Sequence, residues 1–313
     1  MSQRGMRPPS LRSLVAASLV IVAMAAVAGL TFVSRVHAQV PQATGQNVTP
    51  AFEGWEQNAD GSLNLVFGYY NRNVEEEIDL PIGPDNNLSP GMPDQGQPTH
   101  FFPRRNRFVF RVKVPKDFGK QEIVWTITSK GVTEKAYGSL KPDYFINDVV
   151  INNNNGAGGP GGGANDTIDN KAPSLTVDGE KIRRAKVGEP VDLSASAKDD
   201  GKPKVQPMPH SNSAAARAAR GTPNTATGLR MTWFLYRGPN NVQFDPPQAE
   251  VWEDYRDGGN SPWSPGWVTP KAPPDGKWLV HAKFGEPGTY VLRCQAHDGG
   301  LSTIEDITFV VSK

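Results

Sequence analysis

The sequence predicts an all-β protein in which two antiparallel β domains follow an N-terminal signal helix. Its 313 residues include 32 glycines and 28 prolines, which favour turn-rich β structure over long helices. Short segments that alternate apolar and polar residues recur between turn sequences, as expected for strands with one buried face. An Asn/Gly-rich segment divides these strands into two groups. We therefore expect two β domains, the second of them a sandwich.

Residues 1–38 have the composition of an export signal peptide. Three arginines within the first 12 residues precede the apolar run Leu14–Val33, and Val36-His37-Ala38 supplies the small residues of a cleavage site. That run is 20 residues long, whereas a typical signal core has roughly 7–15. An uncleaved membrane anchor is therefore the alternative to cleavage, and it would be the protein's one contact with a membrane. Both interpretations predict an extracytoplasmic protein that is periplasmic, secreted or at the cell surface.

The charge of the exported part argues against a nucleic-acid partner. The chain has 33 Lys and Arg and 32 Asp and Glu, but residues 1–38 hold four arginines and no acid. Residues 39–313 therefore carry 29 basic and 32 acidic side chains, a net charge of −3. Nucleic-acid affinity comes mainly from neutralising phosphates, which a slightly acidic protein does not favour. The single cysteine, Cys294, excludes an intramolecular disulfide and a thiolate metal cluster.

Residues 47–151 are predicted to form the N-terminal β domain. The turn sequence Asn58-Ala59-Asp60-Gly61 suits a hairpin, because glycine tolerates a positive φ. Leu80–Phe102 carries five prolines, too many for a central strand, and is expected to be a long excursion. The predicted strands are Phe52–Trp55, Ser62–Tyr70, Arg107–Val114, Ile123–Thr128 and Val132–Tyr137. In Arg107–Val114 we expect Phe108, Phe110, Val112 and Val114 to share the apolar face.

Residues 152–170 are predicted to be a flexible linker. The run Asn152–Asn155 is followed by Gly158–Gly163, and neither buries enough apolar surface to offset the entropy of ordering the chain. A phosphate-binding Gly-rich loop is the alternative. It is disfavoured because no Lys-Ser/Thr pair follows and no helix is indicated after it.

Residues 171–313 are predicted to form a β-sandwich with insertions near 202–228 and 245–276. Each predicted strand ends at a Gly-, Pro- or Asp-containing turn. The predicted strands are Val191–Ala197, Met231–Leu235, Trp278–Phe284, Tyr290–Ala296 and Ile307–Val311.

Three features of this second domain carry a resemblance. They are Val187–Leu193 (VGEPVDL), the mid-domain Trp233, and Gly285–Leu292 (GEPGTYVL) with the later Asp298-Gly299. Together they resemble bacterial extracellular immunoglobulin-like modules of the PKD/cadherin-like kind. The resemblance implies an immunoglobulin-like sandwich and no particular ligand. The Trp-Asp-Phe-Gly-Asp-Gly run of PKD modules is absent, and Cys294 lacks the partner cysteine of antibody domains.

The first domain resembles segments of uncharacterised exported bacterial proteins. The resemblance is carried by Phe67–Asn73, Asp94–Phe101 and Pro103-Arg104-Arg105. It implies a bacterial, secreted setting and no activity.

Three groups of residues are candidate sites. Asp199 and Asp200 follow one strand and Asp298 another, and in an immunoglobulin-like sandwich these turns meet at one end. Their oxygens would suit calcium, the only cofactor that the sequence suggests, while His297 would favour a transition metal. The alternative is that the Asp-Gly pairs only form turns.

The second candidate group is aromatic and lies in the insertion near 245–276. It consists of Trp252, Tyr255, Trp263 and Trp267. Exposed rings could stack on sugars or bind a proline-rich partner, and the alternative is that they fold back over the sandwich.

The third group, His100, Arg104 and Arg105 with the nearby Arg107, could bind an anion. The alternative is a solvated surface balanced by Glu75–Glu77.

The sequence contains no motif typical of catalysis. The histidines are scattered singly, and no spacing singles out a pair of carboxylates. We therefore predict a non-enzymatic binding or structural module at the bacterial cell envelope that recognises an envelope protein or a glycan through loops. Two alternatives are an enzyme or accessory subunit acting on cell-wall or extracellular polymer, and a calcium-stiffened spacer.

Overall fold

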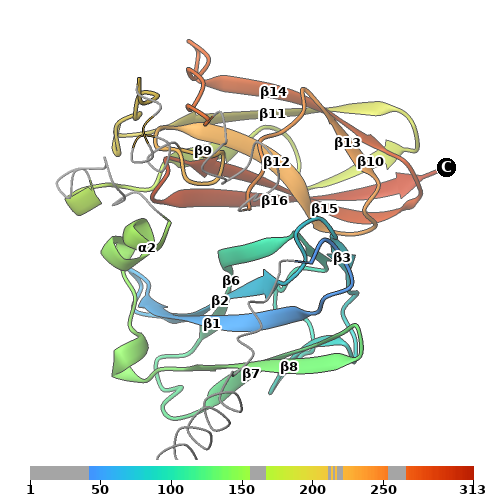
Figure 1. Cartoon of the computed structure of the whole chain (residues 1–313). Helices are drawn as coiled ribbons and strands as arrows, with labels where there is room; N and C mark the ends of the chain where they lie inside the picture. The colour runs from blue at the N-terminus through green and yellow to red at the C-terminus, as the bar shows by residue number, and fades with distance from the viewer. Residues whose placement is uncertain (1–41, 156–166, 211–212, 214–215, 217–220, 253–265) are drawn as a thin grey trace, which may run out of the picture. The chain divides into compact units, whose positions relative to one another are not determined.

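The computed structural model of the chain is built almost entirely of antiparallel β-sheets, which confirms the predicted fold class (Figure 1). It describes residues 42–155, 167–210, 213, 216, 221–252 and 266–313. These residues belong to one compact unit, Pro41–Lys313. The predicted signal peptide lies outside the described residues. Among those residues, no helix is long and apolar enough to cross a membrane.

The N-terminal β region consists of two three-stranded sheets around an aromatic core. One sheet has the order β1 (Val48–Gln57), β2 (Leu63–Asn71), β6 (Arg104–Val114), and the other β4 (Asn86–Ser89), β7 (Glu122–Ser129), β8 (Val132–Ser139). The short strands β3 (Ile78–Asp79) and β5 (His100–Phe101) pair beside them. In the core, Phe67 stacks on Phe110 with ring centroids 5.4 Å apart, and Trp125 lies edge-on to both. The Pro-rich excursion therefore supplies an edge strand, β4, as its prolines require.

A β-bulge in β6 corrects the predicted apolar face. Phe110, Val112 and Val114 enter the core as expected, but the register with β2 shifts between the pairs Phe67↔Phe110 and Tyr69↔Asn106. Phe108 lies in this bulge with a φ of 53°. Three residues of β6 here lie opposite the single Gly68 of β2, and the Phe108 side chain leaves the core to pack in a separate cluster with Ile151 and Leu301.

A short helix occupies the start of the segment predicted to be a linker. Helix α2 (Asp148–Asn154) is capped by Asn147, whose side chain accepts a hydrogen bond from the Val150 amide at 3.1 Å. Asn152 is fully buried, so this part of the Asn run is packed and the prediction of a flexible tether is wrong there. Residues 156–166 of the predicted linker lie outside the described part of the chain. The domain boundaries stay a prediction.

The C-terminal half is an immunoglobulin-like sandwich, as the strand order shows. One sheet has the order β13 (Val242–Asp245), β14 (Lys277–Phe284), β11 (Pro190–Lys198), β9 (Ser174–Val177). The other has the order β10 (Ile182–Lys186), β16 (Ser302–Ser312), β15 (Gly288–His297), β12 (Arg230–Arg237). Named in chain order with a split first strand, these are the ABED and CFG sheets of the immunoglobulin fold. Strand β10 pairs in parallel with β16, and the other pairs are antiparallel.

The sandwich core holds the lone cysteine. Cys294 on β15 is fully buried opposite Trp233 on β12. Burial raises the pKa of its thiol far above the ordinary value. The thiol is therefore protonated and shielded in the folded protein.

Candidate ligand-binding cavity

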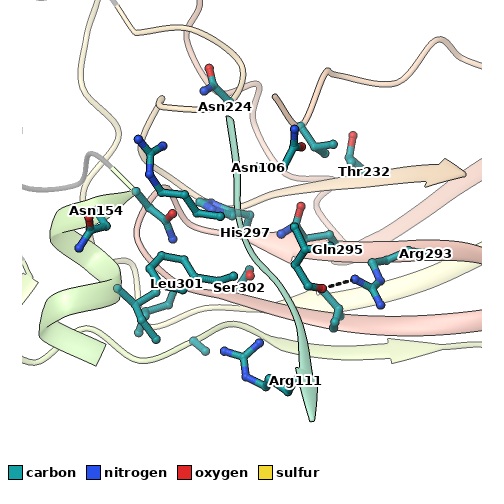
Figure 2. Close-up of a pocket in the computed structure, with 18 of the residues that line it drawn as sticks. Asn106, Arg111, Asn154, Asn224, Thr232, Arg293, Gln295, His297, Leu301 and Ser302 are labelled. Carbon is teal, nitrogen blue, oxygen red and sulfur yellow. Dashed lines mark hydrogen bonds between the residues drawn. The ribbon is translucent and has the colours of Figure 1, made fainter. Parts of the chain in front are cut away.

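A cavity of about 710 Å³ lies between the β1-β2-β6 sheet and the β12-β15-β16 sheet. Successive side chains of a strand point to opposite faces of its sheet. On β15, Leu292, Cys294 and Ala296 fill the sandwich core, so Arg293, Gln295 and His297 line the cavity instead. Figure 2 shows these side chains together with Arg111 and Asn106 of β6, Thr232 of β12 and Asn154 of α2. The cavity is thus built mainly on strands, and α2 contributes to its wall.

The cavity lining combines side-chain amides with aromatic rings. An amide has both a donor and an acceptor, and several of these groups also bond within the protein: Asn154 and Asn155 donate to the carbonyls of Val150 and Gly300. The rings add flat apolar surface. The amides are Gln57, Asn58, Asn106, Asn147, Asn154, Asn155, Asn224 and Gln295, and the rings are those of Tyr69, Phe102, Phe108, Phe145, Phe234 and Tyr236. Such a surface suits a ligand that carries many hydroxyl groups and some exposed C–H surface.

Five arginines also line the cavity, and three of them are held by carboxylates. Arg105 lies 2.6 Å from Glu53, and Arg111 lies 2.7 Å from Glu56. Arg293 forms a two-pronged pair with Asp306 at 2.7 and 2.8 Å. The other two are Arg107 and Arg230.

Burial and ion pairing shift the pKa of Glu53 and of Arg293 in opposite directions. Burial raises the pKa of Glu53, and the charges of Arg105 and Arg107 oppose that shift. Burial would lower the pKa of Arg293, but Tyr236 and Asp306 reverse it, so that the pKa rises. Arg293 also lies 3.4 Å from the centre of the Tyr236 ring and donates to the Val109 carbonyl at 2.6 Å. It therefore joins the C-terminal sandwich to β6.

Arg230, at the start of β12, is held differently. Its guanidinium donates to the backbone carbonyls of Ala226 and Asn224. No carboxylate of the described residues lies within 4 Å of it. Burial lowers the pKa of Arg230 to about 10, and only the charge of Asp298 opposes that shift. Arg230 is therefore a desolvated charge without an adjacent counter-ion in the described part of the protein.

His297 lies near Arg230 and is neutral. Its Nδ1 accepts a hydrogen bond from the Gly299 amide at 2.7 Å, which places the proton on Nε2. Burial lowers the pKa of His297 well below its usual range, and the charge of Arg230 lowers it further. His297 thus offers an N–H donor without a charge.

The other end of β12 joins the C-terminal sandwich firmly to the Pro-rich excursion. Arg237 pairs with both oxygens of Asp94 at 2.8 and 2.9 Å and donates to the Gln97 carbonyl at 2.8 Å. The Tyr236 hydroxyl donates to the Gly96 carbonyl at 2.5 Å, and the Thr99 amide donates to the Tyr236 carbonyl at 3.2 Å. These bonds fix the sheets that enclose the cavity.

The three aspartates of the predicted calcium site have separate roles in turns. Asp298 is fully buried, and its Oδ1 accepts from the amides of Gly300 and Leu301 at 2.6 and 2.7 Å. Its Oδ2 accepts from Asn170, which also donates to Asn152. Burial raises the pKa of Asp298 to about 6, against these hydrogen bonds.

Asp199 and Asp200 accept from the next turn amides, those of Gly201 and Lys202. No three His, Cys, Asp or Glu side chains within the described ranges gather as metal ligands. Calcium binding stays a prediction.

The predicted aromatic group is only partly described. Trp252 stacks on Phe102 of the N-terminal β region, with ring centroids 4.7 Å apart and an interplanar angle of 10°. This contact agrees with aromatic rings that fold back onto the protein. Trp267 is half-buried, and its amide donates to the Gly221 carbonyl at 2.8 Å. Tyr255 and Trp263 lie outside the described residues.

The predicted anion-binding group is dispersed among separate partners. His100 is almost fully buried and lies 2.7 Å from Asp79 and 3.2 Å from Glu77. Arg105 pairs with Glu53, and the Arg104 guanidinium lies 5.3 Å from the Tyr70 ring. His100 and Arg105 do line the cavity. Each is paired with an acid distant in the sequence, and anion binding by this group stays a prediction.

Sequence reasoning missed Arg230 and Gln295, and it named His297 only as a candidate transition-metal ligand. The two on β15 alternate with core residues, so the sequence marks them as a polar face. It gives no indication that another sheet covers that face.

Comparisons with known proteins add little to this description. No protein-family model matches the sequence, and no curated protein matches it. Among solved structures, a conjugative transposon lipoprotein from Bacteroides eggerthii is 9% identical with a TM-score of 0.26, over 44% of this chain and 95% of the other. The Yersinia pseudotuberculosis adhesin InvE is 10% identical with a TM-score of 0.23, over 86% of this chain and 59% of the other.

Immunoglobulin domains 1–4 of Sidekick-1 are 12% identical, also with a TM-score of 0.23, over 85% of this chain and 48% of that one. At TM-scores this low, the likenesses carry no argument about function. The immunoglobulin-like assignment rests on the strand order.

Proposed function

We propose that the protein is an exported, non-enzymatic binding module of the bacterial cell envelope, and that it binds a glycan in the cavity. The observation that carries the proposal is the lining of the cavity, in which side-chain amides and aromatic rings converge on two facing sheets. The export part of the proposal rests on the composition of residues 1–38.

The size and chemistry of the cavity support a glycan over a protein partner. Small-molecule sites typically enclose about 300–1,000 Å³, and the cavity volume of about 710 Å³ falls in that range. An Asn or Gln side chain can donate to one sugar hydroxyl and accept from another. A concave site of this kind admits a short oligosaccharide and excludes the folded surface of a protein.

The rigidity of the site also supports a binding role. Asn106, Thr232 and Gln295 line the cavity from β6, β12 and β15, which belong to hydrogen-bonded sheets, while Asn58, Asn147 and Asn224 lie outside the strands. A site held by regular strands needs little ordering when the ligand arrives, which preserves affinity.

A glycan array with the purified protein tests the proposal, followed by calorimetry on the best glycan. We expect Gln295→Ala and Asn224→Ala to weaken binding roughly tenfold each, because each removes a hydrogen-bonding pair of groups. Gln243→Ala, an exposed glutamine on β13 outside the cavity, is the matched control.

A blank array with folded protein would contradict the proposal. Binding that survives both cavity variants but is lost in Trp267→Ala would move the site to the aromatic insertion. Release of new reducing ends from a bound glycan would favour an enzyme.

A further inference from the structure

We infer that the cavity selects an acidic glycan, whose carboxylate or phosphate group lies against Arg230. The inference rests on the proposed glycan cavity and names the chemical class that it takes. It comes from the difference between Arg230 and the ion-paired arginines around it.

The donor groups of Arg230 are only partly used. A guanidinium has five N–H groups in a planar fork. Two of them point to the carbonyls of Ala226 and Asn224, and the other three have no acceptor among the described residues. Arg230 lines the cavity, so these donors are within reach of a ligand. A carboxylate or phosphate accepts two parallel N–H groups of a guanidinium in a short, charge-assisted pair.

The neighbours of Arg230 favour an anion over a neutral group. The two carbonyls that it contacts carry no formal charge, so neither is a counter-ion for its guanidinium. His297 adds an N–H donor on Nε2 and no competing charge. The acid whose charge reaches Arg230, Asp298, has one oxygen bonded to two turn amides and the other to Asn170. The negative charge that would complete this site is therefore left to the ligand.

Arg111 and Arg293 show the contrast within the same cavity. Each has a carboxylate at 2.7 Å, Glu56 and Asp306 respectively. A ligand anion at either arginine would have to displace or crowd that carboxylate. Arg230 needs no such displacement, so we place the anion there.

Titration calorimetry with three probes tests the inference. The probes are D-glucuronic acid, D-glucose 1-phosphate and D-glucose, each measured on the wild-type protein, Arg230→Gln and the control Arg184→Gln. Arg184 is an exposed arginine on β10 outside the cavity lining. We expect at least one acidic probe to bind about tenfold more tightly than glucose, as charge-assisted pairing implies. That preference should vanish in Arg230→Gln and persist in Arg184→Gln. Preference for glucuronic acid alone indicates a carboxylate, and for the sugar phosphate alone a phosphate.

The histidine beside Arg230 gives a second readout by NMR. A bound anion should raise the pKa of His297 because it offsets the field of Arg230. Arg230→Gln should raise the same pKa without any ligand and should abolish the further rise on adding the acidic probe. Arg230→Lys keeps the charge, so part of the probe-induced rise should return. The unfolding temperature of each variant checks that it is folded.

The outcomes separate this inference from the proposed function. If glucose binds and neither acidic probe is preferred, the acidic class is wrong and the glycan cavity stands. Equal preference for an acidic probe in the wild type and Arg230→Gln would contradict the role of Arg230. If no probe binds and the glycan array is blank, both proposals fail.

Discussion

The two ends of β12 hold arginines in opposite ways. Arg237, at the end of the strand, is locked between Asp94 and the Gln97 carbonyl of the Pro-rich excursion. Arg230, at the start, lines the cavity, and within the described part of the chain its hydrogen-bond partners are two backbone carbonyls. The same residue type therefore fastens the molecule at one end of a strand and leaves donors available at the other. The comparison shows that the groups bonded to an arginine, more than the residue type, distinguish a structural arginine from a candidate binding residue.

We predict the largest effect at the cavity end of β15, where the buried Asp298 carboxylate accepts hydrogen bonds from two turn amides and Asn170. Asp298→Ala would strip the acceptor from two buried turn amides and from Asn170. We expect the free energy of unfolding to fall by about 3 kcal/mol, the scale of two unsatisfied buried donors. Urea denaturation measures it, with the exposed Asp117→Ala as the control. A loss as small as the control's would show that these bonds do not hold the cavity end.

The next largest change in stability is expected at the Arg237 end of β12. Arg237→Met removes the pair with Asp94 and the bond to Gln97. Because the Asp94 side chain is 44% exposed, water compensates part of the loss. We expect about 1–2 kcal/mol of destabilisation in the same urea assay. A double-mutant cycle with Asp94→Ala should return a coupling of roughly half that, and a coupling of zero would mean that the pair contributes nothing.

The free energy of unfolding should also depend on pH through His100, which lies near the same contact between the N-terminal β region and the sandwich. His100 pairs with Asp79 and Glu77, and the same two acids accept bonds from the backbone and side chain of Asn240 on the C-terminal sandwich. Burial alone would lower the pKa of His100, but the hydrogen bonds and charges of the two acids raise it above its ordinary value.

A raised histidine pKa makes a stabilising contribution that is complete below about pH 6.5 and is lost as the pH rises through the folded-state pKa. We expect wild-type stability to fall over that window relative to His100→Gln, in urea titrations at stepped pH. Parallel curves for the two proteins would show that His100 is not the titrating group.

The smallest effect should come from Arg230. Arg230→Met removes a desolvated charge that has no adjacent carboxylate in the described residues. We expect stability without ligand to change by less than about 1 kcal/mol in either direction, in contrast to Arg237→Met. A loss as large as that of Arg237→Met would show that Arg230 is structural.

Local patterns predicted the long core strands but not six shorter ones, which are β3, β4, β5, β9, β10 and β13. Alternation located the core strands of both halves, and the turn sequence at residues 58–61 indeed separates β1 from β2. The failures were local exceptions to the same patterns. The bulge in β6 turned Phe108 out of the core, and Asn147 started a helix where an Asn run predicted only flexibility. Both depend on packing against distant residues, such as Leu301 beside Phe108.

The candidate site was harder to predict because its two walls are far apart in the sequence. Arg293 reaches the Val109 carbonyl across 184 positions. His100 and Arg105 were recognised as chemically notable, but their acidic partners, Asp79 and Glu53, were not assigned to them. A single sequence shows that Gln295 and His297 form a polar face, and only the fold shows what covers that face.

The buried thiol of Cys294 provides a natural probe of how often the sandwich opens. Its neighbours on β15 line the cavity, while its sulfur is sealed in the sandwich core with a raised pKa. A thiol reagent can therefore reach it only when the sheet opens, so the labelling rate counts opening events without any engineered probe. A ligand held in the cavity should slow that rate in proportion to its occupancy, since it binds the closed form alone. The only cysteine of the sequence thereby reports both the opening of the sandwich and the occupancy of the neighbouring cavity.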